Sequence, residues 1–164
     1  IAQGLDAYDV MTVRHKIQGS DIVEGRFRNG KLMEDLSDCD AIIFGSPTYM
    51  GNVAAQFKAF ADATSEIWGE QMWSGKLAAG FTCGTGINGD QGNTIQYFMT
   101  LANQHGMLWM GLDSAAGFTD RGVNRMGFQS GVVAHIEEDK VDKNDLDTAK
   151  YLGRRVAQYV LSTN

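Results

Sequence analysis

The sequence predicts an α/β fold in which a parallel β-sheet is covered by helices on both faces. Three observations lead to this prediction. Strand-like and helix-like segments alternate along all 164 residues, the order that right-handed crossover connections in a parallel sheet require. Residues 41–45 form a continuous apolar run, which is typical of a strand buried on both faces. Glycine occurs 20 times and proline once, which indicates tight turns between the elements.

The first elements lie before the apolar run. Residues 8–15 alternate well enough for a strand, with Val10 and Val13 as its branched members. Residues 16–31 are rich in glycine and charge, so they are expected to form a connection. A short helix is expected over residues 32–37.

The strand at 41–45 is followed by a turn over 46–52 and then by a helix. Apolar residues of that helix lie near helical spacing, namely Ala55, Phe57, Phe60, Ala61, Ile67 and Trp68. The same strand, turn and helix order then repeats. It gives a strand over 76–82, a Gly-rich turn and a helix over 94–104.

The last part of the chain holds two further strands and a closing helix. Strands are expected over 107–112 and 132–134, with the polar stretch 113–131 between them. The closing helix has Asn144 or Asp145 available as N-cap. Its apolar face comprises Leu146, Ala149, Leu152, Val156, Tyr159 and Val160. No repeat or linker divides the chain, so residues 1–164 are expected to form one domain, and its opening inside a helix indicates that the natural protein begins upstream.

Charge and composition narrow the function classes. Fourteen basic and twenty acidic side chains give a net charge of −6, which disfavours binding to nucleic acid or to an anionic membrane. The longest uncharged stretch, 91–112, is interrupted by polar side chains, so no membrane span is expected. Cys39 and Cys83 have neither a CxxC nor a zinc spacing, so no metal site is expected and a reduced, cytoplasmic setting fits.

A Gly-rich loop is the most distinctive local pattern. Gly84, Gly86 and Gly89 form G-x-G-x-x-G between a predicted strand and a predicted helix, where ligands bind in open parallel sheets. One interpretation is a dinucleotide site, with Asp113 as the ribose-binding acid. Residues 90–93 delay the predicted helix, however, and a complete strand, loop and helix precede the motif. A purely structural glycine turn is the second interpretation.

A family resemblance supplies the third interpretation. The segment DCDAIIFGSPTYMGNVAAQFKAFADATSEIW, followed by GKLAAGFTCGTGINGDQGNTI and LANQHGM, resembles the flavodoxin-fold NAD(P)H:quinone oxidoreductases of the WrbA-like type. The resemblance is closest over residues 40–107. It implies a flavodoxin-like three-layer sandwich with strand order 2-1-3-4-5, and an FMN held by three loops. It also implies NAD(P)H as electron donor and a quinone-like molecule as acceptor.

The resemblance assigns residues to these roles one by one. The loop that packs against the flavin ring comprises Ser46, Pro47, Thr48, Tyr49, Met50, Gly51 and Asn52. The loop that borders its pyrimidine edge comprises Thr82, Cys83, Gly84, Thr85, Gly86 and Ile87. The substrate pocket is assigned Trp68, Gln104 and His105, although His105 equally fits a helix-capping role. No side chain is expected to act as acid or base, since the flavin carries the chemistry.

The sequence departs from the family pattern in ways that bear on function. The first strand and its phosphate-binding loop are not found, and that strand is the centre of a 2-1-3-4-5 sheet. Tyr49 stands where the family has Arg, and Gln104 stands where it has His. The main hypothesis is an FMN-dependent NAD(P)H:quinone oxidoreductase. The alternatives are a flavodoxin-type electron carrier and a flavin-less interaction domain.

Apolar side chains near Gly69 also predict assembly. This segment has more large apolar side chains than a ligand pocket alone would use, namely Trp68, Met72 and Trp73. Exposed patches of this kind tend to be interfaces. The sequence therefore predicts a homo-oligomer with two-fold axes. In it Trp68 lies near the flavin site of its own or an adjacent subunit.

Overall fold

The computed structural model describes residues 1–115 and 122–163. It contains a mainly parallel sheet with the strand order β4-β3-β5-β7-β8, in which β6 pairs with the same edge of β5 as β7. The parallel strands are β3 (Ala41–Tyr49), β5 (Leu77–Gly84), β6 (Leu108–Trp109) and β7 (Val132–Glu137). Two short antiparallel strands flank them, β4 (Asn52–Val53) and β8 (Lys140–Val141), and β1 (Ile22–Val23) and β2 (Arg26–Phe27) form a separate hairpin.

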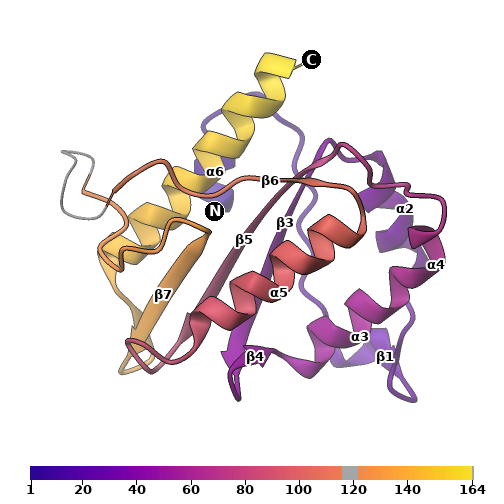
Figure 1. Cartoon of the computed structure of the whole chain (residues 1–164), viewed down its shortest axis with the longest axis horizontal. Helices are drawn as coiled ribbons and strands as arrows, with labels where there is room; N and C mark the ends of the chain where they lie inside the picture. The colour runs from indigo at the N-terminus through magenta and orange to yellow at the C-terminus, as the bar shows by residue number, and fades with distance from the viewer. Residues whose placement is uncertain (116–121, 164) are drawn as a thin grey trace.

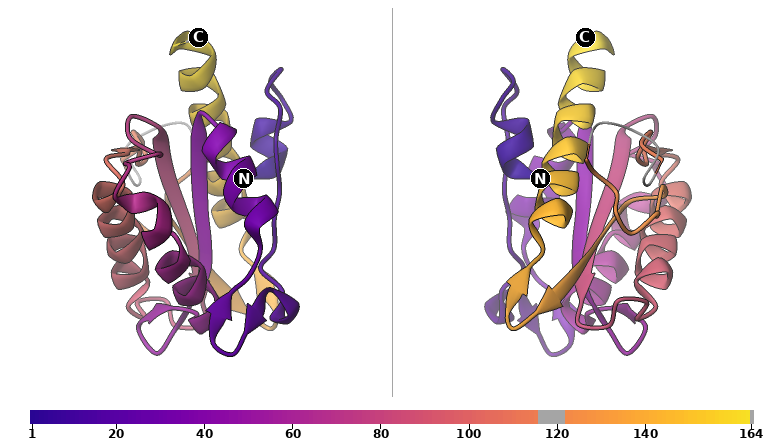
Figure 2. Two further views of the ribbon diagram at one scale, coloured as in Figure 1. Left: turned by 90° about the vertical axis from the view of Figure 1, so that its right-hand side faces the viewer. Right: turned by 90° about the vertical axis from the view of Figure 1, so that its left-hand side faces the viewer.

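Helices cover both faces of this sheet, as the two edge-on views in Figure 2 show. One face carries α3 (Ala55–Ala63), α4 (Ser65–Trp68) and α5 (Gln91–Gln104), and the other carries α1 (Ala2–Leu5) and α6 (Lys143–Thr163). Helix α2 (Gly30–Asp38) lies beside the β3 edge (Figure 1). The predicted three-layer α/β architecture is therefore confirmed.

Strand alternation divides the core between the two faces. On the α5 side, Phe44 of β3 and Phe57 of α3 pack on Phe98 of α5, with ring centroids 6.0 and 4.8 Å from that of Phe98. Gly80 of β5 makes this possible, because a Cβ there would lie 2.8 Å from the Phe98 ring. Helix α5 therefore lies close against β5, and its first turn is placed directly beside the loop that follows β5.

The opposite face is closed by a tight helix contact. Gly4 of α1 and Gly153 of α6 face one another, and a Cβ on either would overlap the backbone of the other helix. The absence of side chains at these two positions lets α1 pack directly on α6. Helix α6 covers the sheet through Leu152 and Val156, both fully buried beside Leu77 of β5.

The predicted strands and helices are found with shifted bounds, and one strand is wrong. Residues 8–15 form no strand, because no neighbouring strand pairs with them among the described residues. Only Leu108–Trp109 of the predicted strand at 107–112 pairs with β5. Helix α5 begins at Gln91 instead of residue 94, so the glycine motif is followed by a helix almost at once.

The closing helix begins earlier than its predicted caps. Helix α6 starts at Lys143, and the carboxylate of Asp142 accepts a hydrogen bond from the backbone N–H of Asn144 at 2.7 Å. Asp142 is therefore the N-cap, and Asn144 and Asp145 lie inside the first turn. No helix within residues 1–115 or 122–163 is both long enough and apolar enough to cross a membrane.

The edge of β3 that faces away from β5 is open. Residues 41–47 pair with β5 on one side, and along them no strand in the described part of the chain pairs on the other. A groove of about 700 Å³ runs beside this edge, lined by residues 13–19, by α2 and by Phe57 and Phe60 of α3. This open edge agrees with the gap expected when the first strand of a 2-1-3-4-5 sheet is not found.

Candidate functional site

The two loops singled out in the sequence leave the sheet side by side. In the β3–β5 ladder, Ser46 is paired with Thr82 and Pro47 with Cys83. Because the strands are parallel, the loops at 46–52 and 82–89 emerge at the same carboxyl-terminal edge (Figure 1). This edge is therefore the candidate site.

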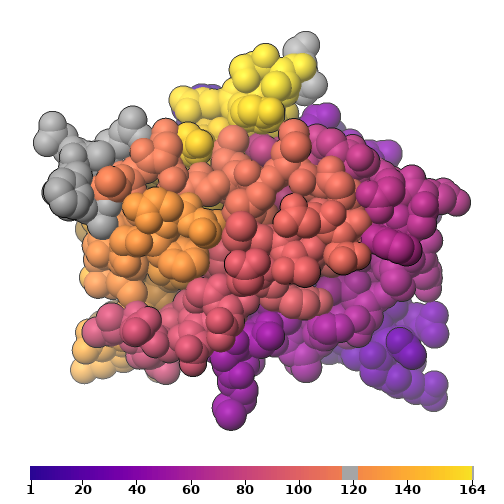
Figure 3. All heavy atoms as spheres, viewed as in Figure 1, coloured from indigo at the N-terminus to yellow at the C-terminus, as the bar shows by residue number. Residues whose placement is uncertain are grey.

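The first loop is a narrow hairpin. Met50 and Gly51 both have positive φ angles, 48° and 76°, as the tightest hairpin turns require. Tyr49 is 65% exposed and Met50 is fully exposed, and the turn protrudes from the lower edge of the molecule in Figure 3. This loop therefore presents a flat aromatic side chain at the edge of the sheet.

Two side chains of the first loop form hydrogen bonds within the protein. The Ser46 hydroxyl is buried, donates to the carbonyl oxygen of Pro47 at 2.9 Å and accepts from the N–H of Ala54 at 2.9 Å. The side-chain oxygen of Asn52 accepts from the N–H of Val53. Both side chains shape the loop, since they hold its ends to α3 and β4.

The second loop is held from two sides. From within, the Gln91 side chain donates through Nε2 to the carbonyl oxygen of Gly86 at 2.6 Å. From β7, His135 Nε2 lies 3.0 Å from the carbonyl oxygen of Thr85. A carbonyl oxygen can only accept, so His135 carries a proton on Nε2. The sequence analysis assigned no role to either residue. For Gln91 the available signal was its position at the start of a helix that follows a glycine loop.

The backbone of the second loop offers free donors. The N–H groups of Thr85, Gly86, Ile87 and Asn88 have no acceptor within residues 1–115 and 122–163. Gly84 and Gly86 are close-packed, since a Cβ on them would lie 3.0 Å from Gln91 Nε2 and 3.2 Å from the Cα of Gly89. The donors are therefore fixed in place by glycine and Gln91.

This donor set fits the flavin ring that the resemblance implies. The pyrimidine edge of isoalloxazine carries acceptor atoms, which consecutive backbone N–H groups can satisfy, while its flat face requires apolar or aromatic cover. The loop at 85–88 supplies the N–H donors, and the exposed Tyr49 supplies the aromatic cover. The described residues contain no loop that matches the Ser/Thr-rich phosphate-binding turn of the resemblance.

Three threonine hydroxyls connect the two loops to α5. Thr48 Oγ1 lies 2.8 Å from Thr82 Oγ1 and 2.8 Å from Thr94 Oγ1. Thr82 and Thr94 are buried. Thr94 was missed in the sequence, because its contact depends on where α5 packs.

Cys83 has no sign of nucleophilic activation. Its thiol is half-buried and unpaired, and burial raises its pKa above the ordinary value for cysteine. The neutral thiol is therefore favoured near pH 7. Cys83 is a small packing residue in the loop, and no covalent role follows.

The predicted substrate-pocket residues lie at the other end of the molecule. Gln104 and His105 close α5, which has 14 residues and is therefore about 21 Å long. Trp68 ends α4, on the same side as the end of α5 and away from the loops (Figure 1). Within one chain, the structure brings Trp68, Gln104 and His105 together near one another and away from the two loops.

His105 is part of the core at that end. Its Nε2 lies 2.8 Å from Thr64 Oγ1, whose own proton is donated to the carbonyl oxygen of Ala61 at 2.7 Å. Its ring lies against Trp73, with centroids 4.6 Å apart. Burial lowers the pKa of His105, and its Nδ1 has no partner within the described part of the chain. The imidazole is therefore neutral and packed against Thr64 and Trp73, so it is not the charged cap that a helix C-terminus would favour.

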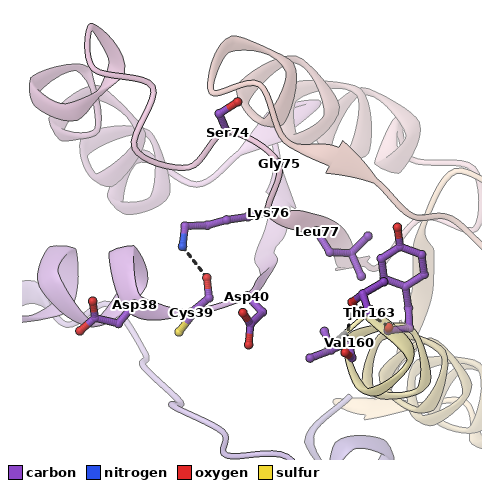
Figure 4. A pocket seen from close by; sticks show the side chains of 10 residues that line it. Asp38, Cys39, Asp40, Ser74, Gly75, Lys76, Leu77, Val160 and Thr163 are labelled. Atoms are coloured by element: carbon purple, nitrogen blue, oxygen red, sulfur yellow. Dashed lines mark hydrogen bonds between the residues drawn. The ribbon is translucent and has the colours of Figure 1, made fainter.

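A pocket of about 400 Å³ lies at the amino-terminal edge of the sheet (Figure 4). There Lys76 extends to the end of α2 and donates through Nζ to the carbonyl oxygens of Ser37 and Cys39, at 2.7 and 2.5 Å. Lys76 thus satisfies carbonyl groups at a helix end. The cation of this pocket therefore has a structural role.

Comparison with known proteins gives a consistent result. A family model described as NADPH-dependent FMN reductase matches residues 11–119. Flavodoxin FldP of Pseudomonas aeruginosa is 37% identical over 131 residues, which cover 75% of this chain and 71% of that protein. An NAD(P)H dehydrogenase (quinone) of Geobacter sulfurreducens is 35% identical over 80% of this chain and 67% of its own length. Another, from Archaeoglobus fulgidus, is 38% identical over 76% and 61%.

A solved structure extends the likeness to the fold. The flavodoxin, WrbA-like protein from Agrobacterium tumefaciens superposes with a TM-score of 0.74 at 35% identity. The superposition covers 99% of this chain and 86% of that one. The sheet and helices described above therefore form a flavodoxin-like fold.

Proposed function

The chain belongs to the NADPH-dependent FMN reductase family, and on this premise we propose that it is an FMN-dependent oxidoreductase. It passes two electrons from NAD(P)H to a quinone-like acceptor. The observation that carries the proposal is the row of free backbone N–H groups at 85–88, on the loop beside the one that exposes Tyr49. Relatives named NAD(P)H dehydrogenase (quinone) support the choice of acceptor.

The geometry of the two loops supports an assignment of the residues that would hold the flavin. The N–H groups of residues 85–88 donate to acceptor atoms on the ring, and the loop at 46–52 covers it. Gln91 and His135 keep the donors in position, since they hold the carbonyl groups of Gly86 and Thr85. FMN, when bound, supplies the two-electron chemistry, because it accepts a hydride from reduced nicotinamide and releases it to a quinone.

The loops at 46–52 and 82–89 carry no charged side chain, although the Asp90 carboxylate directly follows the second loop and lies close to Gly51. Burial raises the pKa of Cys83, which favours the thiol near pH 7, and Thr48 and Thr82 carry hydroxyl groups. The protein therefore orients the ring and its reactants, and no side chain of the two loops transfers a proton. Donor and acceptor would occupy this one site in turn, which would give ping-pong kinetics.

Assembly is the second part of the proposal. Of the three apolar residues that the sequence placed in one patch, Trp68 and Met72 are exposed, at 48% and 44%, whereas Trp73 is fully buried in the core and does not belong to the patch. Because Trp68 lies away from the loops of its own chain, we assign it to the site of an adjacent subunit in a homo-oligomer with two-fold axes. A cytoplasmic location is supported by the two unpaired cysteines.

The test uses the natural full-length protein. It is expected to purify yellow or to quench flavin fluorescence on titration with FMN. It is also expected to oxidise NADPH with a benzoquinone in the absence of a separate reductase. A colourless protein that does not bind FMN contradicts the proposal. FMN binding without turnover favours the electron-carrier alternative. The name of one relative, flavodoxin FldP, fits that alternative.

A further inference from the structure

The hydroxyl groups of Thr48, Thr82 and Thr94 form a small hydrogen-bond network in which each donor can be identified. They come from the end of β3, from β5 and from α5. Thr48 Oγ1 is central, 2.8 Å from each of the other two. Thr82 is 1% exposed and Thr94 is 0% exposed, whereas Thr48 is only partly buried.

Counting protons fixes which hydroxyl donates. Each hydroxyl has one proton and two acceptor lone pairs. Within residues 1–115 and 122–163, the side chains of Thr82 and Thr94 make no hydrogen bond other than the one to Thr48. An interior hydroxyl proton without an acceptor is costly. Both buried hydroxyls therefore donate to Thr48 Oγ1.

This arrangement leaves Thr48 with a single role. Its two lone pairs are occupied by the protons of Thr82 and Thr94, so Thr48 can only donate. Its own proton has no acceptor among the described residues, and Thr48 itself is partly exposed, in the loop at 46–52. Any other arrangement leaves the proton of Thr82 or Thr94 unpaired in the interior.

We propose that Thr94 and Thr82 are positioning residues that make Thr48 a hydrogen-bond donor to an acceptor atom of the flavin. This inference rests on the proposed function, because it requires FMN at the two loops. It goes beyond that function in naming the direction of the hydrogen bond and in assigning a role to a helix residue outside both loops. Thr94 acts through Thr48 and does not itself reach the ligand.

The test compares four forms of the full-length protein: wild type, Thr94→Val, Thr94→Ser and Thr100→Val. Valine keeps the shape of threonine without its hydroxyl, and serine keeps the hydroxyl. Thr100 is the matched control, since it lies on the same helix, is exposed and donates only to the carbonyl oxygen of Gln96. FMN affinity is measured by fluorescence quenching, the flavin environment by the absorbance bands of the bound form, and folding by thermal unfolding without FMN.

We expect Thr94→Val to weaken FMN binding roughly three- to tenfold and to shift the absorbance bands. Thr94→Ser is expected to restore both, and Thr100→Val to change neither. Equal affinities for Thr94→Val and Thr100→Val overturn the inference, as does a loss that serine fails to restore. If Thr94→Val does not fold, Thr82→Val provides the same test, because Thr82 is the other donor. A wild-type protein that binds no FMN overturns the proposed function, and the inference falls with it.

Discussion

His135 Nε2, on β7, lies 3.0 Å from the carbonyl oxygen of Thr85, in the glycine loop that follows β5. The two residues come from neighbouring strands of the sheet. This hydrogen bond therefore fixes the outer side of the loop to a rigid element. Gln91 fixes its inner side, so a loop with three glycines keeps one backbone conformation.

Loss of the Gln91 amide is expected to loosen the loop. Gln91→Leu keeps the volume approximately and leaves the carbonyl group of Gly86 without its donor. Because the N–H groups at 85–88 then lose their fixed direction, FMN affinity should fall about fivefold. Fluorescence titration measures it, and Gln96→Leu on the exposed side of the same helix is the control. Equal affinities in the two variants would show that the loop needs no internal support.

Replacement of Gly80 should destabilise the whole fold. In Gly80→Ala the new Cβ would lie 2.8 Å from the ring of Phe98 and 2.9 Å from that of Trp109. Overpacking of this kind costs about 1–3 kcal/mol. Gly69→Ala is the control, because a Cβ there meets nothing within 4 Å and Gly69 has helical backbone angles. Urea unfolding should show a lower midpoint for Gly80→Ala alone.

The buried carboxylate of Asp145 is expected to be a large single contributor to stability. It is 1% exposed and accepts from Arg125 Nε at 2.8 Å, from Arg125 Nη2 at 2.7 Å and from the N–H of His135 at 2.9 Å. Asp145→Ala removes the acceptor for all three, and should cost about 2–4 kcal/mol in the free energy of unfolding. Asp147→Ala, on the same helix at the surface, should cost under about 1 kcal/mol. Comparable losses in the two variants would contradict this assignment.

Stability should fall with acidification because of His105. Burial lowers the pKa of His105 in the folded state, so below the ordinary histidine pKa the unfolded chain binds a proton that the folded chain does not. The contribution is fully present above that pKa and is lost as the pH falls through the folded-state value. Urea unfolding between pH 7.5 and pH 5 measures the slope. His105→Gln should flatten it, and an unchanged slope in this variant would contradict the assignment to His105.

Trp68 is expected to affect turnover more than flavin binding. Its side chain lies away from the loops of its own chain, so Trp68→Ala should lower quinone turnover and weaken assembly while FMN affinity stays within about twofold. Steady-state kinetics and size exclusion with light scattering measure these effects. Leu161→Ala, an equally exposed apolar residue on α6, is the control. A wild-type protein that is a monomer near 18 kDa at micromolar concentration rejects the assembly, and equal loss of turnover and FMN affinity assigns Trp68 to the fold.

The sheet was largely predictable, because continuous apolar runs identify strands buried on both faces. Residues 41–45 and 76–82 became β3 and β5 for this reason. Residues 8–15 showed alternation alone, which does not ensure a strand without a neighbour to pair with. Met11 is almost fully exposed and Val13 is half-exposed, so these residues bury too little to form one.

The neighbouring positions of the two candidate loops were predictable, because each loop follows a strand that the sequence identifies. The loops at 46–52 and 82–87 were found from their residues, and the ladder places them side by side. Thr94, Gln91 and His135 were not found, because each acts through a contact that depends on how α5 and β7 pack. Gln104 and Trp68 show what a motif cannot predict. A motif gives residue types but not the distances between them, and the length of α5 separates Gln104 and Trp68 from the loops.

The open edge of β3 also bears on how the chain could associate with other strands. A sheet edge with unpaired N–H and C=O groups is a template on which another chain can add a strand. Pro47 has no N–H to offer, so it protects the end of the edge nearest the glycine loop. Within the described part of the chain no strand pairs with residues 41–45 on this side, so when residues 1–164 are produced alone an added peptide strand is expected to pair there.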